Sequence, residues 1–451
     1  MLGCRPSIFA HNQLDRFHSE LSMNATSRRS RGDPPCGTTI TRKPGPWLRW
    51  GAPLILAATG FVAGTQFSAK VEKSEPGLPA DSSPEAVASN YTFKCANGPW
   101  GNVEGIWINI ELPDDAILLE NYNRPVKWFF RGYSREKVIA LFQSAGLSEE
   151  QLALLGRDAG WEFSADGCSV HPPDELVLSL SPESRHKIYS VLAHFRENGP
   201  YYAAFGFDPD NLEKKISYSN LPEETVSLFK KMLYPQGDLL LFNDTFLVLA
   251  TLPDSQSKMR FLKTVSRRST FLAKIRVEND SDIDELVAYW GVGGRAKDLR
   301  PLLESLSRVP GGCRLDIVHL LPSFARKRVF TYPRVATEKD ALKVNCHWSS
   351  LNFFNDPPDA TFLTPENVET AFANAYVPVS GSMQLGDVLL FRNPEKSIVH
   401  SAVYVADDIV FTKNGEGTFQ PWLLMKLEDL TPLYSNLRGQ VTVSAYRRKD
   451  M

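Results

Sequence analysis

The residues that could do chemistry lie near the C-terminus, where a cysteine begins an apolar, periodic segment. Cys346 directly follows Asn345, a residue type that often caps helices, and Val344, Trp348 and Leu351 recur at helical spacing. The pattern predicts that Cys346 lies in the first turn of a helix. There the unpaired N–H groups and the positive end of the helix dipole favour the thiolate, which is the nucleophilic form of cysteine.

A histidine follows in a part of the chain with strand character. Turn residues bracket three β-rich runs, 387–391, 398–405 and 409–413, and a short loop joins the last two as an antiparallel hairpin. His400 lies early in the second run, so residues 412–414 are expected opposite it. A cysteine on a helix, a histidine on the sheet and a polar residue on the next strand would form a nucleophile, a base and an orienting group.

These segments carry a family resemblance. Over about residues 330–446 the chain resembles the NlpC/P60 and CHAP branch of the papain-like cysteine peptidase superfamily. The matching segments are Asn345-Cys346, Gly386-Asp387-Val388-Leu389 and His400-Ser401-Ala402-Val403-Tyr404-Val405. The resemblance implies a central antiparallel sheet and a helix that begins at the nucleophile.

The resemblance also implies a role for each residue that matches it. Cys346 would be the nucleophile, with its own N–H as one oxyanion donor, and His400 the general base and acid. The third position falls at Thr412, whereas Asn414 is chemically the better match to the asparagine that orients the base in papain-like enzymes, so Asn414 is favoured and Thr412 is the alternative. Tyr332 is the nearby counterpart of a tyrosine that contributes upstream of the cysteine in this family.

The implied reaction is attack by a thiol on an amide carbonyl, followed by hydrolysis of the thioester. The resemblance points to peptides of cell-wall peptidoglycan as the substrate and to no cofactor or metal. His347-Trp348 replaces the usual small pair after the nucleophile, so a catalytically inactive binding module is an alternative, with His347 a residue that lines the cleft. A cysteine-dependent acyltransferase is another, because the superfamily contains such enzymes.

The region before this domain gives helix signals in series. Ser148 begins a capping box, and Ser181-Pro182 is an N-cap followed by proline at the first helical position. We therefore predict a mainly helical domain of unknown role over 91–310 and an NlpC/P60-like domain over 311–451. The fold class predicted for the whole chain is α+β.

The N-terminal part differs from the rest. Residues 1–49 carry eight cationic and three acidic side chains and are predicted to form a basic disordered tail, and residues 70–90 a linker. Residues 50–69 form an uncharged stretch, and its length is about what a transmembrane helix needs. The cations on one side predict a single-pass anchor in the cell membrane, with the C-terminal domains on the extracytoplasmic side. A cleaved signal peptide and a buried helix are the alternatives.

The amino-acid composition limits the classes of function that remain. The chain has 451 residues, and its 50 Lys and Arg against 52 Asp and Glu argue against nucleic acid as the main partner. Six cysteines without a CxxC pair exclude a disulfide scaffold and give no sign of a zinc site. If the chain is exported, one disulfide is expected, with Cys95 and Cys168 as the favoured pair.

Overall fold

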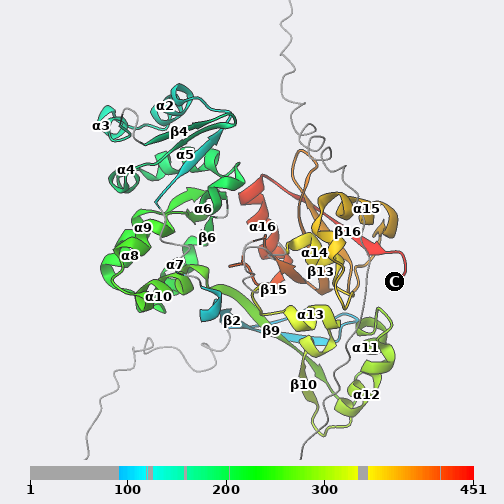
Figure 1. Ribbon diagram of the computed structural model, residues 1–451. Coiled ribbons are helices and arrows are strands. Elements are labelled where there is room, and N and C mark those ends of the chain that lie inside the picture. Colours follow the sequence, from blue (N-terminus) through cyan, green and yellow to red (C-terminus); the bar gives the residue numbers. More distant parts are fainter. Residues whose placement is uncertain are drawn as a thin grey trace, which may run out of the picture. The chain divides into compact units, whose positions relative to one another are not determined.

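Figure 1 shows the computed structural model of the chain, which has several sheets and three hydrophobic cores. The described residues are 91–451 with the exception of 118, 120–124, 157–159, 203, 334–343 and 417. They belong to one unit by backbone contacts, Leu78–Met451.

The first core begins with a three-stranded sheet covered by helices. The strands lie in the order β3-β5-β4, and both pairs are antiparallel. Their bounds are Trp128–Arg131 for β3, Trp161–Ser164 for β4 and Gly167–Val170 for β5. The helices are α2 (Arg135–Ser144), α3 (Glu149–Ala153), α4 (Asp174–Ser179) and α5 (Pro182–Leu192). Ser148 forms the predicted capping box at α3, and Ser181 caps α5.

A second small sheet extends the same core. Its strands are β6 (Phe205–Phe207), β8 (Leu239–Phe242) and β7 (Tyr234–Gln236), in that order. Helices α6 (Gly199–Tyr202), α7 (Pro209–Ser217), α8 (Glu223–Lys231), α9 (Thr245–Thr251) and α10 (Ser255–Ser266) accompany it. Arg185 and Asp244 form an ion pair of 2.5 Å inside this core, where both side chains are almost fully buried.

A long strand pair connects distant parts of the chain. β2 (Asn102–Ile110) pairs with β9 (Arg268–Val277) over its full length, and β1 (Thr92–Lys94) and β10 (Cys313–Asp316) flank them. Figure 1 shows this pair as a blue strand beside a light-green one. The elements that follow are α11 (Ile283–Trp290), α12 (Ala296–Ser307) and α13 (Ser323–Arg328), and the second core joins all of this sheet to the C-terminal region.

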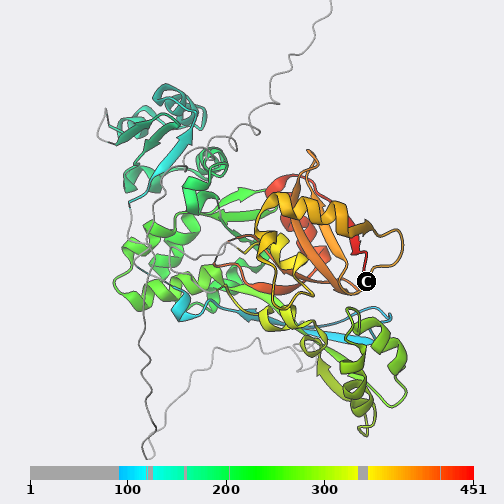
Figure 2. The same cartoon turned by 45° about the vertical axis from the view of Figure 1, so that its right-hand side comes forward.

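The C-terminal region is built on a six-stranded sheet. The strand order is β11 (Tyr376–Pro378), β16 (Thr442–Arg448), β12 (Val388–Arg392), β13 (Ile398–Ala406), β14 (Ile409–Lys413) and β15 (Trp422–Lys426). All neighbouring strands are antiparallel. β12, β13 and β14 correspond to the three runs expected from the sequence. α14 (Cys346–Leu351) packs against β13 and β14, as both views show, and α15 (Pro365–Ala375) and α16 (Leu427–Arg438) complete the region (Figures 1 and 2).

The predicted fold class needs two corrections. The chain is α+β, but residues 91–310 are not mainly helical, because three sheets draw strands from them. Most of those strands have only three or four residues, too few for an alternating pattern to stand out. The predicted transmembrane helix is not supported either: no helix among the described residues is long and apolar enough to cross a membrane. The segment expected to form it, 50–69, and the flanking tail and linker lie outside the described residues.

The expected disulfide is also corrected. Cys95, Cys168, Cys313 and Cys346 are all free thiols. Cys168 belongs to the first hydrophobic core, whereas Cys95 packs against the second. Separate cores hold the two cysteines of the expected pair, so that disulfide does not form.

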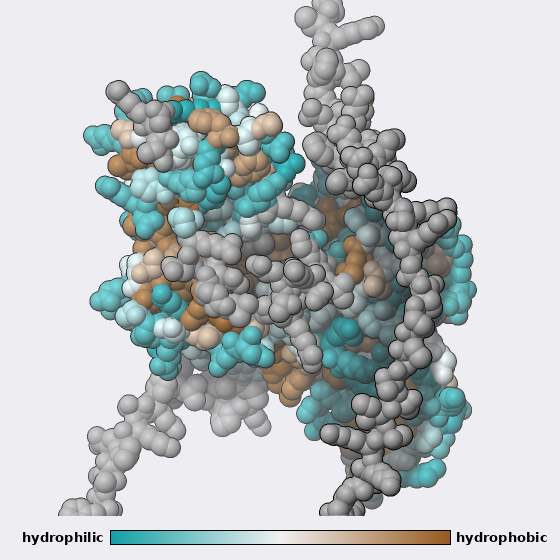
Figure 3. Space-filling model, viewed as in Figure 1, coloured by the Kyte–Doolittle hydropathy of each residue, from teal (hydrophilic) through white to brown (hydrophobic). Residues whose placement is uncertain are grey.

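Hydrophilic and hydrophobic side chains are interspersed on the face seen in Figure 3. The large hydrophobic side chains exposed among the described residues come from different strands, helices and loops: Tyr91, Ile106, Leu154, Phe163, Tyr218, Val309, Val377 and Leu437. Single exposed apolar residues are ordinary in a folded protein. The candidate chemistry is therefore sought in polar clusters and pockets.

Candidate active site

Cys346 is the first residue of α14, where the sequence predicts it. The side chain of Asn345 accepts a hydrogen bond of 2.9 Å from the N–H of Trp348, so Asn345 is the N-cap. The helix packs against the two strands that carry His400 and Thr412. The cysteine is only 6% exposed.

The segment Gly386-Asp387, which directly precedes β12, has a structural role. Gly386 has a φ of +97°, and a Cβ there would meet the ring of Phe354 at 2.3 Å, so only glycine fits. Asp387, which is buried, accepts two hydrogen bonds of 2.7 Å from Arg447 and one of 2.9 Å from the N–H of Gln384. The Gly386-Asp387 pair therefore holds β12 in place and takes no part in the chemistry.

His400 lies in β13 and is fully buried. Its Nε2 is 2.9 Å from Oγ1 of Thr412, and the Thr412 hydroxyl donates to Oδ1 of Asn414 at 3.1 Å. Because that hydroxyl gives its one proton to Asn414, it must accept the Nε2–H of His400. A neutral His400 then carries its proton on Nε2, and its Nδ1 is free to accept one.

The two candidates for the third residue thus belong to one chain of hydrogen bonds. Thr412 contacts the imidazole directly, and Asn414 contacts Thr412. Asn414 in turn donates to Sδ of Met425 at 3.1 Å, which agrees with its oxygen facing Thr412. Thr412, at the position the family pattern gives, is therefore the residue that contacts the imidazole, whereas Asn414, which the sequence favoured, fixes the direction of the Thr412 hydroxyl.

The thiol of Cys346 interacts with two imidazoles. Burial by itself raises the pKa of this thiol, but charge interactions with His347 and His400, together with hydrogen bonds to both, outweigh it. The pKa of Cys346 therefore lies well below its ordinary value. Burial lowers the pKa of His400, and its Nδ1, which has no other hydrogen-bond partner among the described residues, is the ring atom left for the thiol.

His347 is a residue that sequence reasoning placed at the cleft without a role in the chemistry. Its Nδ1 is 3.0 Å from Oγ of Ser401, and that hydroxyl donates to Oγ of Ser350 at 3.1 Å. Burial lowers the pKa of His347, but the charge of Cys346, a hydrogen bond to it and the charge of Glu416 raise the pKa overall. His347 is thus the better placed of the two imidazoles to carry the positive charge beside a thiolate.

Lys413 is a second residue that the sequence reasoning missed. It is fully buried next to Thr412, and its Nζ donates to the carbonyl oxygen of Gly415 at 2.6 Å. Burial lowers the pKa of Lys413 to about 8, although the charges of Cys346 and Glu416 act in the opposite direction. A lysine at the end of a strand that begins with Ile409, Val410 and Phe411 was the signal that could have found it.

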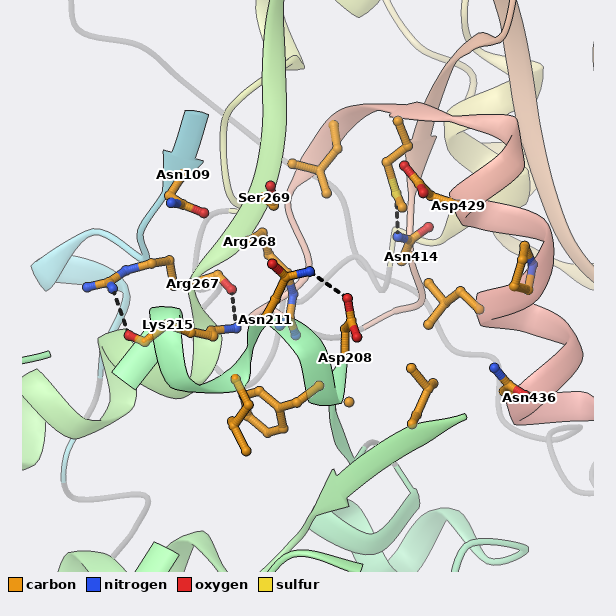
Figure 4. A pocket seen from close by; sticks show the side chains of 18 of the residues that line it. Asn109, Asp208, Asn211, Lys215, Arg267, Arg268, Ser269, Asn414, Asp429 and Asn436 are labelled. Atoms are coloured by element: carbon orange, nitrogen blue, oxygen red, sulfur yellow. Dashed lines mark hydrogen bonds between the residues drawn. The ribbon is translucent and has the colours of Figure 1, made fainter. Parts of the chain in front are cut away.

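A pocket of about 820 Å³ adjoins the cluster. Asn414, which Figure 4 shows, lines it together with Met425 and Tyr434. Tyr434 stacks on the ring of His400. The pocket wall therefore shares residues with the hydrogen-bond chain behind His400. Cys346, His347, His400 and Thr412 are not among the residues that line the pocket, so Asn414 and the ring of Tyr434 connect the two.

Other candidates lie elsewhere. The hydroxyl of Tyr332 donates to the carbonyl oxygen of Ile110 at 3.4 Å, and burial raises the pKa of Tyr332 to about 12. Tyr332 thus contacts a residue of β2 and is not brought to the thiol. Among the residues the structure describes, no group of three or more His, Cys, Asp or Glu side chains could hold a metal ion.

No family model, no curated protein and no solved structure matches the chain. The NlpC/P60 resemblance therefore stays a prediction made from the sequence.

Proposed function

We propose that the chain is a cysteine-dependent hydrolase of amide bonds, with Cys346 as the nucleophile. The observation that carries this proposal is the interaction of the thiol with both His347 and His400, which lowers its pKa well below the ordinary value. A lowered pKa favours the thiolate, which is the reactive form of cysteine. Nucleophile, base and orienting group have the arrangement used in acyl transfer by cysteine enzymes.

The proposed reaction has two steps. The thiolate of Cys346 attacks the amide carbonyl, and the tetrahedral oxyanion collapses to a thioester as the amine leaves with the proton of the His347 imidazolium. Water then adds to the thioester and gives a proton to Nδ1 of the neutral imidazole of His400, and the thiolate departs as the acid is released. Transfer of that proton from His400 to His347 restores the starting state. Thr412 keeps the proton of His400 on Nε2 throughout, so that Nδ1 faces the reacting atoms.

Peptides of cell-wall peptidoglycan are the proposed substrates, on the strength of the sequence resemblance. The purified chain is expected to release muropeptides from peptidoglycan, and Cys346→Ala is expected to abolish the release. Cys313→Ala, which removes another free thiol outside the cluster, is the matched control and should leave it unchanged. Release that survives Cys346→Ala would contradict the assignment.

A second candidate function is a binding module that has the same fold but no catalytic activity. Burial favours it, since Cys346 is 6% exposed and His400 is fully buried. Labelling by iodoacetamide, mapped by mass spectrometry, separates the two. A working pair predicts fast labelling of Cys346 at neutral pH that is lost in His400→Ala, whereas an inactive module predicts slow labelling in both proteins.

A further inference from the structure

The pocket beside the cluster has an uneven distribution of charge. Lys215 of α7 and Arg267 and Arg268 at the start of β9 lie together on one side of it (Figure 4). Asp429 lies on α16, on the side of Asn414. The acids Asp238 and Glu428 and the cation Lys214 also line the pocket, and Lys214 lies 4.6 Å from the ring of Tyr91.

Two of the three grouped cations have no carboxylate partner among the described residues. Arg267 is paired with Glu111, through an Nε bond of 2.8 Å. Arg268 donates from Nε to the uncharged side chain of Gln420 at 3.3 Å. Lys215 donates to the carbonyl oxygen of Arg267 at 2.7 Å.

Asp208, another acid of the pocket, already accepts hydrogen bonds from its own helix. Asp208 caps α7, where it accepts hydrogen bonds from the N–H of Asp210 at 3.0 Å and from the side chain of Asn211 at 2.5 Å. Aromatic rings are the remaining neighbours, with Phe205 5.9 Å from the guanidinium of Arg268 and Phe207 4.8 Å from the ammonium of Lys215.

Holding these cations close together raises the free energy of the folded chain unless an anion is bound. Burial, together with the charges of Arg268 and Arg267, lowers the pKa of Lys215 well below its ordinary value, and burial lowers the pKa of Arg268. Like charges in a partly desolvated pocket repel one another, and a bound anion would relieve that repulsion. A guanidinium beside an ammonium also suits the geometry of a carboxylate or a phosphate.

We propose that Arg268 and Lys215 bind an anionic group, a carboxylate or a phosphate, of the molecule that occupies this pocket. The further step, that this molecule is the acyl substrate of Cys346, rests on the proposed function. The pocket is also lined by Asn414, which accepts a hydrogen bond from Thr412, and by Tyr434, which stacks on the ring of His400. Leu212, Leu423 and Leu433 line the pocket as well, so the body of the ligand is expected to be partly apolar.

Binding of three probes to the full chain tests the proposal by isothermal titration calorimetry. N-acetylleucine carries a carboxylate on an apolar amide body, N-acetylleucinamide is its uncharged counterpart, and inorganic phosphate reports on the other anion. We expect N-acetylleucine to bind about tenfold more tightly than the amide, as a charge-assisted hydrogen bond permits. Binding of phosphate would indicate a phosphate-bearing ligand, whereas binding of the carboxylate alone would indicate a carboxylate-bearing one.

Variants assign the preference to the proposed residues. Arg268→Gln is expected to reduce the tenfold affinity ratio to within about twofold, whereas Arg268→Lys should keep part of it. Lys215→Gln should also reduce the ratio, but only in part, because the guanidinium of Arg268 remains. Arg276→Gln is the matched control, because Arg276 lies on the same strand, pairs with Glu278 and does not line the pocket.

Two outcomes would overturn the proposal: an equal affinity of the wild-type chain for both leucine derivatives, or a preference that persists in both Arg268→Gln and Lys215→Gln. Cys346→Ala separates this test from that of the hydrolase, since it should leave the binding of all three probes unchanged. A charge preference without muropeptide release would contradict the hydrolase alone. Release without a charge preference would contradict the anion site alone.

Discussion

The ring of Tyr434 stacks on the imidazole of His400, with centroids 4.0 Å apart and planes inclined by 15°. Tyr434 belongs to α16, whereas His400 lies in β13, so this contact joins a helix to the strand that carries the proposed base. Phe391 packs against the same imidazole at 5.2 Å. Together with the bond to Thr412, these rings leave the imidazole little freedom to turn.

Removal of the stacked ring should loosen the base. We expect Tyr434→Leu to slow iodoacetamide labelling of Cys346, because His400 can then rotate away from the thiol, and to cost about 1 kcal/mol of stability beyond the lost burial. Tyr434→Phe keeps the ring and should label at nearly the wild-type rate. Rates are measured at pH 7 by mass spectrometry, and an unchanged rate in Tyr434→Leu would show that the stack does not position His400.

The pH dependence of labelling tests which imidazole supports the thiolate. The pKa of Cys346 lies well below its ordinary value, so labelling of the wild-type chain should remain fast at pH values where an ordinary cysteine is a protonated thiol. His347→Gln removes a charge and a hydrogen bond that favour the thiolate, and the midpoint of the rate profile should therefore rise by ~1–3 pH units. His319→Gln, in the 3-10 helix Ile317–Leu320, is the control. A profile that His347→Gln leaves in place would assign this role to His400 alone.

The orienting hydroxyl can be removed with little change of shape. Thr412→Val would leave the buried Nε2–H of His400 without an acceptor, at a cost of about 1–3 kcal/mol in the free energy of unfolding. Muropeptide release and Cys346 labelling should both fall. Thr412→Ser restores the hydroxyl and should recover most of the loss, and Asn414→Ala should have the smaller effect. A larger effect of Asn414→Ala than of Thr412→Val would reverse the assignment.

Lys413 makes stability depend on pH in a defined direction. Its pKa in the folded chain, about 8, lies below the ordinary 10.5, so between these values the unfolded chain binds more protons. Stability therefore rises with pH across this window, and the contribution of Lys413 is lost as pH falls through 8. Lys413→Met should flatten that rise in urea unfolding at pH 7.5 and pH 10. Lys137→Met, at an exposed position of α2, should leave the slope as it is.

Local signals predicted much of the candidate site. Asn345 and the spacing of the following apolar residues placed Cys346 at a helix start, because a cap and its first turn involve neighbours in the chain. The β-rich runs likewise placed His400 on a strand beside the next one. The short strands of residues 91–310 gave no such signal, and their sheets are held by pairing and packing that a short run of residues does not show.

The choice between Thr412 and Asn414 depended on tertiary structure. β13 and β14 pair Val403 with Phe411 and Tyr404 with Val410, and this register does not bring Thr412 directly opposite His400. The bond between His400 and Thr412 joins two side chains whose directions depend on how both strands pack, so it is not visible in the spacing from His400. The same limit applies to His347, whose role depends on Ser401 of the neighbouring sheet.

The amino-acid sequence by itself determined the local structure around the proposed nucleophile and the proposed base, because helix caps and strand periodicity are local properties. Only the tertiary structure decided which side chains surround them: Tyr434 on the ring of His400, and Arg268 and Lys215 in the pocket whose wall Tyr434 shares. Those contacts join residues far apart in the chain. They arise when separate elements bury their apolar faces against one another, and that arrangement is a property of the whole fold.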